Sequence, residues 1–343
     1  MAKVLTITLN PAIDVTIQLK ELQIGQVNRQ ESVEIHAAGK GLNIAQVLKD
    51  LGHEVIVSGF LGATNRQIFD DHFKEAQFQP EFIYIEGETR QNIKIAEHSG
   101  RMTDLNGKGF FISELDKKNL FQKIEMILPQ VDVVAIAGSL PQGFSVDELQ
   151  QLIKLIQQQG KKVALDTSGK ALVAAIECQP WMIKPNTDEL VESYQLPATT
   201  YAEQKKLFAN LAKIEHVVIS MGEDGVNWLN DTHPLHATAP KVIVKSTVGA
   251  GDSLLAGMIH GLLGGFSAEE TLKTATAIAS HAVTQIGFRI PNTEKLNQLK
   301  ATSEKSYLRK KTAIDALIIY TMSYVMSYHS YLSNVTHTVC KHE

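Results

Sequence analysis

Short apolar runs alternate with longer segments of helical periodicity from residue 1 to about residue 300. Six runs are rich in valine and isoleucine and are bounded by glycine or proline, which is typical of strands buried on both faces. They are KVLTITL, HEVIVSGFLG, VDVVAIAGS, KKVALDTS, WMIKPN and HVVISMG. Helices are predicted between them over residues 41–51, 65–76, 145–159 and 200–214. This alternation predicts an α/β fold with a mostly parallel central sheet, and with ligands bound at the carboxyl ends of its strands.

Two segments depart from this rhythm because polar and apolar residues alternate strictly along them. Residues 14–19 (DVTIQL) and 90–97 (RQNIKIAE) each have one apolar face and one polar face. In the second segment Ile93 and Ile95 share a face, opposite Asn92 and Lys94. Strands with one solvent-exposed polar face fit poorly inside a parallel core. We therefore predict a small β flap, with strands near 14–19 and 90–105, that covers a site from one side. An ordinary surface hairpin is the alternative.

Composition narrows the class of protein. The chain has 343 residues and a net charge of -4 with both signs interspersed, which argues against a nucleic-acid partner. Its two cysteines, Cys178 and Cys340, lack metal-ligand spacing, so we expect neither a disulfide framework nor a zinc site, and a cytoplasmic location is favoured. The amino-terminal residues read as a strand without a basic and apolar leader, so no signal peptide is expected.

The carboxyl-terminal residues differ from the rest, so we divide the chain into a main domain, 1–300, and an extension of unknown role, 301–343. Residues 316–340 contain no Asp, Glu, Lys or Arg, yet they are rich in Ser, Thr, Tyr, His and Asn. The longest purely apolar run there, residues 316–319, is far shorter than the roughly 20 residues that span a bilayer. An extra helix or a loosely ordered tail is the expectation, and a membrane anchor is the alternative.

A glycine turn, residues 249–251, stands directly before an aspartate and an apolar helical pattern. The preceding residues 242–244 have the composition of a strand, so the expected order is strand, turn and helix. A helix that begins near Gly251 would leave the backbone amides of Ala250, Gly251 and Asp252 free to bind an anion. Asp252 can then accept a proton from an attacking hydroxyl, although a role as helix cap explains the aspartate alone equally well.

Two further motifs open predicted helices. Gly39, Lys40 and Gly41 begin one of them, where a lysine can bind an anionic ligand or simply be solvated. Asn186 and Glu189 stand three residues apart at another helix start, so their side chains share a face and offer oxygen ligands to Mg²⁺. The same pair also reads as a capping box, which is the favoured interpretation when the motif is taken alone.

Weaker signals follow other strands. Gly222 and Gly225 predict a tight turn where a nucleotide can lie against backbone, and Ser139 in AGSLPQG can bond to a sugar hydroxyl. Arg90 and Lys94, at the flap, can pair with a phosphate or can belong to an exposed charged face. Taken together, the strand-end signals favour phosphoryl transfer to a small anionic alcohol.

A series of motifs resembles the ribokinase-like (phosphofructokinase B type) sugar kinases in order and in spacing. The series is TLNPAID, AAGKGLNIA, GFLG, AGSLPQG, LDTSGKAL, KPNTDEL, SMGEDG and STVGAGDSLLAG, within residues 1–299. Inside this family, HAAGKGLNIAQVLKDLG and TRQNIKIAE are most similar to the bacterial 1-phosphofructokinase branch, which overlaps tagatose-6-phosphate kinase. The resemblance implies a three-layer ribokinase-like sandwich with a small β lid, and a homodimer paired through lid strands.

The resemblance also implies a role for each matching residue. Asp252 would be the catalytic base, beside a phosphoryl group held by the amides of Gly249, Ala250 and Gly251. The sugar would be held by Asp14, Gly39, Asn43 and Ser139, and its own phosphate by Lys40, Arg90 and Lys94. Mg²⁺ and the ATP phosphates would be organised by Lys184, Asn186 and Glu189, and the nucleotide pocket would be lined by Ser220, Gly222 and Gly225. In members that bind K⁺, the matching carbonyls are those around Ser246, Val248 and Gly287.

The interpretation that follows is ATP-dependent phosphorylation of D-fructose 1-phosphate at its 6-hydroxyl, which gives D-fructose 1,6-bisphosphate and ADP. Tagatose-6-phosphate kinase and 6-phosphofructokinase are the alternatives, because the same scaffold accepts either substrate with small changes in the pocket. A non-catalytic sugar-phosphate sensor is an alternative of a different class. The acid, the glycine turn and the Asn–Glu pair argue against a sensor, since a protein that only binds needs no base.

Overall fold

The computed structural model describes residues 1–209, 214–230, 234–285, 289–303 and 305–307. Residues Met1–Ser306 form one compact unit. Its larger sheet contains β1 (Lys3–Thr8), β4 (Glu54–Gly62), β5 (Gln79–Ile85), β8 (Val133–Ala137), β9 (Lys162–Asp166), β10 (Met182–Ile183), β11 (His216–Ser220), β12 (Val226–Leu229), β13 (Leu235–Ala237) and β14 (Lys305–Tyr307). A second sheet contains β2 (Ala12–Leu19), β3 (Ser32–Ala38), β6 (Gln91–Glu97) and β7 (Met102–Asn106).

Ten α-helices and two short 3₁₀ helices are found among the described residues. The α-helices are α1 (Lys40–Asp50), α2 (Gln67–Ala76), α3 (Glu114–Ile127), α4 (Val146–Gln158), α5 (Gly169–Glu177), α6 (Thr187–Tyr194), α7 (Tyr201–Ala209), α8 (Ala250–Leu263), α9 (Ala268–Ala282) and α10 (Thr293–Thr302). The 3₁₀ helices are η1 (Leu128–Gln130) and η2 (Gly222–Asp224). The predicted helices therefore form, with ends that differ by one or two residues where both ends are described.

The larger sheet has the strand order β14-β13-β12-β11-β10-β9-β8-β1-β4-β5. From β5 to β11 neighbouring strands are parallel, and β12 and β13 continue the sheet as antiparallel strands. All five residues of β8 are buried, as expected for a strand with helices on both faces. Because parallel strands end at one edge, β8, β9, β10 and β11 deliver the residues that follow them to the same place.

Each face of the larger sheet has its own hydrophobic core. On one face α1, α2, α8 and α9 contribute buried side chains such as Leu48, Phe69 and Leu255. On the other face α3, α4, α5, α6 and α7 contribute side chains such as Leu120 and Ile153. The predicted α/β fold, with its mostly parallel sheet between two helical layers, is confirmed.

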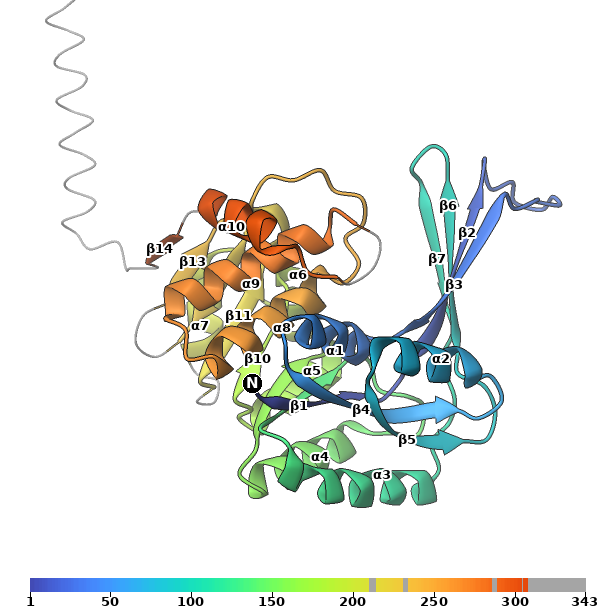
Figure 1. Ribbon diagram of the computed structural model, residues 1–343, viewed down its shortest axis with the longest axis horizontal. Helices are drawn as coiled ribbons and strands as arrows, with labels where there is room; N and C mark the ends of the chain where they lie inside the picture. Colours follow the sequence, from blue (N-terminus) through green and yellow to red (C-terminus); the bar gives the residue numbers. More distant parts are fainter. Residues whose placement is uncertain (210–213, 231–233, 286–288, 304, 308–343) are drawn as a thin grey trace, which may run out of the picture. The chain divides into compact units, whose positions relative to one another are not determined.

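The second sheet, ordered β3-β2-β6-β7, projects from the body as a lid (Figure 1). The two strands predicted from strict alternation, β2 and β6, lie side by side and are parallel, with Val15 opposite Ile93 and Ile17 opposite Ile95. The flanking strands β3 and β7 pair with them in antiparallel fashion. The predicted small β lid is therefore present. Its two flanking strands are needed because a pair of strands alone is at best marginally stable in water.

One predicted strand is wrong. Residues 242–244 belong to no strand, and the side chain of Ile243 is 85% exposed. The backbone amides that follow, those of Lys245 and Ser246, donate to the carbonyl oxygen of Val283 at 2.7 and 3.2 Å. These hydrogen bonds attach the segment to Val283, the residue after α9. A β-branched composition alone was therefore not enough to make residues 242–244 a strand.

The proposed boundary near residue 300 stays a prediction. The helix α10 ends at Thr302, and most of the extension, residues 308–343, lies outside the described residues. In the part of the chain that the structure describes, no helix is both long and apolar enough to cross a membrane.

Close packing of α8 on α9 gives a test of the fold. A Cβ atom on Gly257 would lie 2.6 Å from the Cα atom of Ala275, whereas one on Gly261 would meet only the side chain of Thr271, at 2.7 Å. Both alanine variants gain the same helix propensity, but the nearest atom at Gly257 is a backbone Cα atom, whereas the two nearest atoms at Gly261 are side-chain atoms that a χ1 rotation moves. We expect Gly257→Ala to lower the free energy of unfolding by about 1–3 kcal/mol relative to Gly261→Ala, measured by urea unfolding. Equal stability of the two variants would contradict this packing.

Candidate active site

The amino-terminal ends of α1 and α8 meet at the carboxyl edge of the sheet. Gly249, with φ 83°, precedes the first residue of α8, so the helix begins within one residue of the predicted position. Asp252, in the first turn, is only 4% exposed, and its Oδ2 accepts a hydrogen bond of 2.7 Å from Nδ2 of Asn43 in α1. The aspartate therefore bonds to the neighbouring helix, which distinguishes it from a simple cap.

Glycine at position 251 lets a lysine lie against this turn. A Cβ atom there would come within 3.0 Å of Nζ of Lys184, which follows β10 and is buried. The backbone amides of the first turn have no partner within an α-helix and carry its positive dipole end. The turn and Lys184 together put amide donors and an ammonium group next to the carboxyl group of Asp252, an arrangement that can bind an anion.

A second carboxylate, that of Asp166, joins the lysines at this edge. Asp166 ends β9 and is completely buried. Its Oδ1 lies 3.2 Å from Nζ of Lys40 and 3.5 Å from Nζ of Lys184. Nζ of Lys40 lies also 3.9 Å from Oε1 of Glu189. Asp166 was not among the residues singled out from the sequence, although an acid placed directly after the buried run KVAL was the signal that could have identified it.

Burial and neighbouring charges shift the pKa values of this cluster in opposite directions. Burial, and then the negative charge of Asp166, raise the pKa of Asp252 to about 7 against the opposing effect of Lys40, Asn43 and Lys184. Burial would also raise the pKa of Asp166, but Lys184 and Lys40 outweigh it and hold that pKa below the ordinary value. Burial alone would lower the pKa of Lys40, yet the surrounding carboxylates raise it. Asp252 is therefore the carboxyl group that exchanges a proton near neutral pH.

At the base of the lid, Arg90 binds backbone carbonyl groups. Its guanidinium donates to the carbonyl oxygens of Pro11 at 3.2 Å, Asn10 at 3.1 Å and Gly107 at 2.9 Å. Burial lowers the pKa of Arg90, with Asp14 opposing that effect. The guanidinium thus holds the lid strands to the end of β1, and a phosphate would have to share or replace these carbonyl partners.

The polar face of the lid carries Asp14. Its Oδ2 lies 2.7 Å from Nζ of Lys94, and its Oδ1 accepts a hydrogen bond of 3.2 Å from Nδ2 of Asn92. Ser139, after β8, accepts a hydrogen bond of 3.1 Å from Asn10. Asn10 is thus a shared neighbour of Ser139 and of the Arg90 guanidinium, and it connects the lid residues to the end of β8.

Asn186 and Glu189 form the capping box of α6. The amide of Glu189 donates to Oδ1 of Asn186 at 2.7 Å, and the amide of Asn186 donates to Oε2 of Glu189 at 2.9 Å. Oε1 of Glu189 takes no part in the capping box and lies 3.9 Å from Nζ of Lys40. It is therefore the one oxygen atom of the two side chains that is left for a magnesium ion. Within the described residues no cluster of three or more His, Cys, Asp or Glu side chains can hold a metal. A single free carboxylate oxygen fits an ion such as Mg²⁺, which usually keeps several of its water ligands.

The predicted nucleotide turn forms after β11. Ser220 pairs with Asn186 in an isolated β-bridge, and Gly222 and Gly225 have φ of 60° and 97°. A Cβ atom on Gly225 would lie 2.1 Å from the carbonyl oxygen of Ala237, so only glycine fits there. The turn therefore stands directly beside the capping box of α6.

Two of the remaining candidates have clear positions and one does not. Gly39, with a Cβ position only 2.8 Å from Cγ2 of Thr8, brings the start of α1 close to β1. Ser246 accepts a hydrogen bond of 3.2 Å from the amide of Val248, just before the glycine turn. Gly287 lies outside the described residues, so the monovalent cation site stays a prediction.

The candidates therefore assemble in two groups. Direct contacts join the first group around Asp166, which consists of Lys40, Asn43, Lys184, Glu189 and Asp252. The lid group consists of Asp14, Arg90, Lys94 and Ser139, and Asn10 connects its parts.

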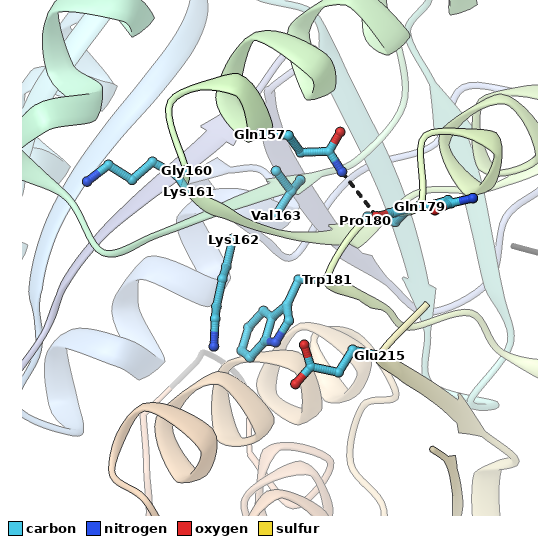
Figure 2. Close-up of a pocket in the computed structure, with 9 residues that line it drawn as sticks. All are labelled: Gln157, Gly160, Lys161, Lys162, Val163, Gln179, Pro180, Trp181 and Glu215. Carbon is cyan, nitrogen blue, oxygen red and sulfur yellow. Dashed lines mark hydrogen bonds between the residues drawn. The ribbon is translucent and has the colours of Figure 1, made fainter. Parts of the chain in front are cut away.

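A surface depression of about 360 Å³ lies at the opposite edge, where β9, β10 and β11 begin (Figure 2). There Nζ of Lys162 lies 4.8 Å from the ring centre of Trp181, and the amide of Gln157 already donates to the carbonyl oxygens of Cys178 and Gln179. Lys162 and Gln157 thus already have partners in the protein, and none of the residues predicted for catalysis lines the depression.

Several known proteins are similar to this chain over most of its length. Residues 7–295 match the family of pfkB carbohydrate kinases. The 1-phosphofructokinase of Vibrio cholerae is 41% identical over 308 residues, which cover 89% of this chain and 97% of that protein. The 1-phosphofructokinase of Escherichia coli K12 is 39% identical over 301 residues, which cover 87% and 96%. The structure of phosphofructokinase-2 from Escherichia coli in complex with potassium has a TM-score of 0.79 at 25% identity, covering 88% of this chain and 99% of that one.

Proposed function

This chain belongs to the pfkB family of carbohydrate kinases, and we propose that its reaction is phosphorylation of D-fructose 1-phosphate at the 6-hydroxyl. MgATP is the phosphoryl donor, and the products are D-fructose 1,6-bisphosphate and ADP. The observation that carries the chemistry is the buried carboxyl group of Asp252 next to the first turn of α8. The choice of sugar is supported by the relatives from Vibrio cholerae and Escherichia coli, which share the name 1-phosphofructokinase.

In this proposal Asp252 removes the proton from the 6-hydroxyl as that oxygen attacks phosphorus. A base works best when its pKa lies near the working pH, and burial beside Asp166 raises the pKa of Asp252 to about 7. Asn43 orients the carboxyl group through its hydrogen bond of 2.7 Å to Oδ2, which leaves Oδ1 for the proton. The amide therefore fixes which oxygen of the base faces the substrate.

The charge on the moving phosphoryl group is balanced by the backbone amides of residues 249–251 and by Lys184. Preorganised donors of this kind act strongly in a site that excludes water. Lys40 contacts Asp166 and Glu189. These contacts favour a role for Lys40 near the ATP phosphates, together with Lys184. Mg²⁺ bound at the free carboxylate oxygen of Glu189, which Asn186 holds in place through the capping box, would supply positive charge to the phosphate oxygens.

Because Lys40 is assigned to the ATP phosphates and Arg90 is bound to carbonyl groups, Lys94 is the main contact for the 1-phosphate of the sugar in this proposal. In the structure its ammonium group neutralises Asp14 at 2.7 Å. A sugar hydroxyl that bonds to Asp14 leaves part of that ammonium charge for a nearby phosphate. Arg90 supports the same phosphate only if its guanidinium releases one of its carbonyl partners, so its main effect is to hold the lid in place.

Comparison of three sugar phosphates tests the proposed substrate. ADP release is followed with MgATP and, in turn, fructose 1-phosphate, tagatose 6-phosphate and fructose 6-phosphate, and the kcat/KM values are compared. We expect the highest kcat/KM for fructose 1-phosphate. Preference for a 6-phosphate would reverse the orientation of the sugar and overturn the assignment of Lys94, and binding without turnover would favour a sugar-phosphate sensor.

The role of the base is tested by Asp252→Asn. The amide cannot accept the hydroxyl proton but has the same shape, so kcat is expected to fall by about 10²–10⁴ while both substrates still bind. Turnover is measured by ADP release and binding by calorimetry. A variant with near-normal kcat would exclude Asp252 as the general base.

We also propose that the lid forms a homodimer through its apolar face. The strand register puts Val15, Ile17, Ile93 and Ile95 on one face, flanked by three exposed side chains, those of Val33, Ile35 and Leu105. An apolar sheet face that is open to water is typical of a surface that associates, and a second copy offers an identical face. The opposite face, with Asp14 and Lys94, stays free for the sugar.

Charge on one face of the lid or the other distinguishes these roles. Ile95→Glu puts a carboxylate in the apolar face, and we expect it to convert the dimer to a monomer by light scattering coupled to size-exclusion chromatography. Gln18→Glu, on the other face of the neighbouring strand, is the control and is expected to leave the dimer intact. If both variants have the oligomeric state of the wild type, the apolar face is not the interface.

A further inference from the structure

The mechanism above leaves the buried carboxylate of Asp166 without a function in proton transfer. We propose that Asp166 is the hydrogen-bond acceptor for Asp252 once Asp252 has taken the sugar proton, and that it positions the base in this way. The inference rests on the proposed function, because it concerns the same phosphoryl transfer. Asp166 acts through Asp252 and through two lysines, so it is a positioning residue.

The two oxygens of the Asp166 carboxylate have different surroundings. Oδ1 lies near the ammonium groups of Lys40 and Lys184, at 3.2 and 3.5 Å. Oδ2 is buried and has no hydrogen-bond partner among the described residues. A buried polar atom without a partner costs about 1–3 kcal/mol, and more when it is charged, so a donor at Oδ2 would be strongly stabilised.

Asp252 can become that donor. Asp252 and Asp166 both lie beside Lys184, because Nζ of Lys184 is 3.5 Å from Oδ1 of Asp166 and 3.0 Å from the Cβ position of Gly251, the residue before Asp252. The two carboxyl groups are close enough for the negative charge of Asp166 to raise the pKa of Asp252. Its Oδ2 is occupied by the amide of Asn43, so the proton belongs on Oδ1. Because Asp252 is only 4% exposed, water competes poorly as a partner for the new O–H group.

The charges that face this pair favour a single proton. Lys40 from α1 and Lys184 after β10 supply two positive charges. Asp166, Asp252 and Glu189 of α6 supply three negative charges when all are ionised. One proton therefore balances the cluster, and it resides on Asp252 because both lysines stabilise the ionised form of Asp166.

The proposed step balances as follows. The O–H bond of the 6-hydroxyl breaks, and its proton moves to Oδ1 of Asp252 while the oxygen forms the new bond to the γ-phosphorus of ATP. The bond from that phosphorus to the bridging oxygen breaks, and ADP keeps the electron pair. The new O–H group of Asp252 donates to Oδ2 of Asp166, which stays ionised. After the products leave, the proton passes to solvent and the base is restored.

Titration of the carboxyl groups tests the inference without any turnover. Aspartates labelled with ¹³C in the carboxyl group are followed by NMR in the full chain without substrate. We expect a titration near pH 7 in the wild type, in agreement with the raised pKa of Asp252, and its loss in Asp252→Asn. In Asp166→Asn the like charge is gone, so the midpoint should fall by about 1–3 pH units. Asp132→Asn, at the opposite edge of the sheet where β1 and β8 begin, is the control and should leave the titration near pH 7 in place.

The pH profile of kcat/KM gives the matching kinetic result. The base must be unprotonated to act, so wild-type activity falls as pH drops below about 7, and the acid limb of Asp166→Asn should move lower by the same amount as the NMR midpoint. Asp166→Glu keeps the charge and should keep an acid limb near that of the wild type, even if kcat falls.

Two results would overturn the inference. One is an unchanged midpoint in Asp166→Asn. The other is an unchanged acid limb together with a higher Mg²⁺ concentration for half-maximal rate, which would give Asp166 a metal-binding role. If Asp166→Asn does not fold, absence of the titration near pH 7 in the wild type still refutes the inference. Because the NMR titration needs no substrate, a wrong choice of sugar would leave it unaffected, and the two failures remain distinguishable.

Discussion

The carboxyl edge of the sheet holds two buried aspartates, and two lysines make that arrangement stable. Removing an ion from water costs several kcal/mol, so Asp166 can stay ionised only because the ammonium groups of Lys40 and Lys184 lie beside it. The field of Asp166 in turn makes ionisation of Asp252 less favourable. Burial is the larger cause of the raised pKa of Asp252, and the ionised Asp166 that the lysines stabilise raises it further.

The fold supplies this cluster from four separate elements. Asp166 ends β9 and Lys184 follows the adjacent parallel strand β10, while Lys40 and Asp252 come from the first turns of α1 and α8. Close approach of α1 to β1 depends on glycine at the start of that helix, since a Cβ atom on Gly41 would lie 2.3 Å from Oγ1 of Thr8. Glycine at position 251 likewise leaves room for Nζ of Lys184 beside the start of α8.

The two faces of the lid sheet also have different properties. Strict alternation gives it a polar face for the sugar and an apolar face that the chain alone leaves partly open. On our proposal one face binds substrate and the other binds a second copy, so association and water exclusion from the site are linked through the same strands. Arg90, held by three carbonyl oxygens at the lid base, is the structural joint between lid and body.

The sequence by itself determined the fold class, the lid strands β2 and β6, the family and the residues of the glycine turn, because periodicity and local spacing are written along the chain. It also predicted the capping box of Asn186 and Glu189, which the structure confirms, but it did not determine that residues 242–244 lack a strand partner. It also left Asp166 unnoticed, since its importance comes from two lysines distant in sequence, by 126 residues in the case of Lys40. Tertiary structure decided these points, because burial and charge pairing depend on distances between side chains that no local pattern encodes.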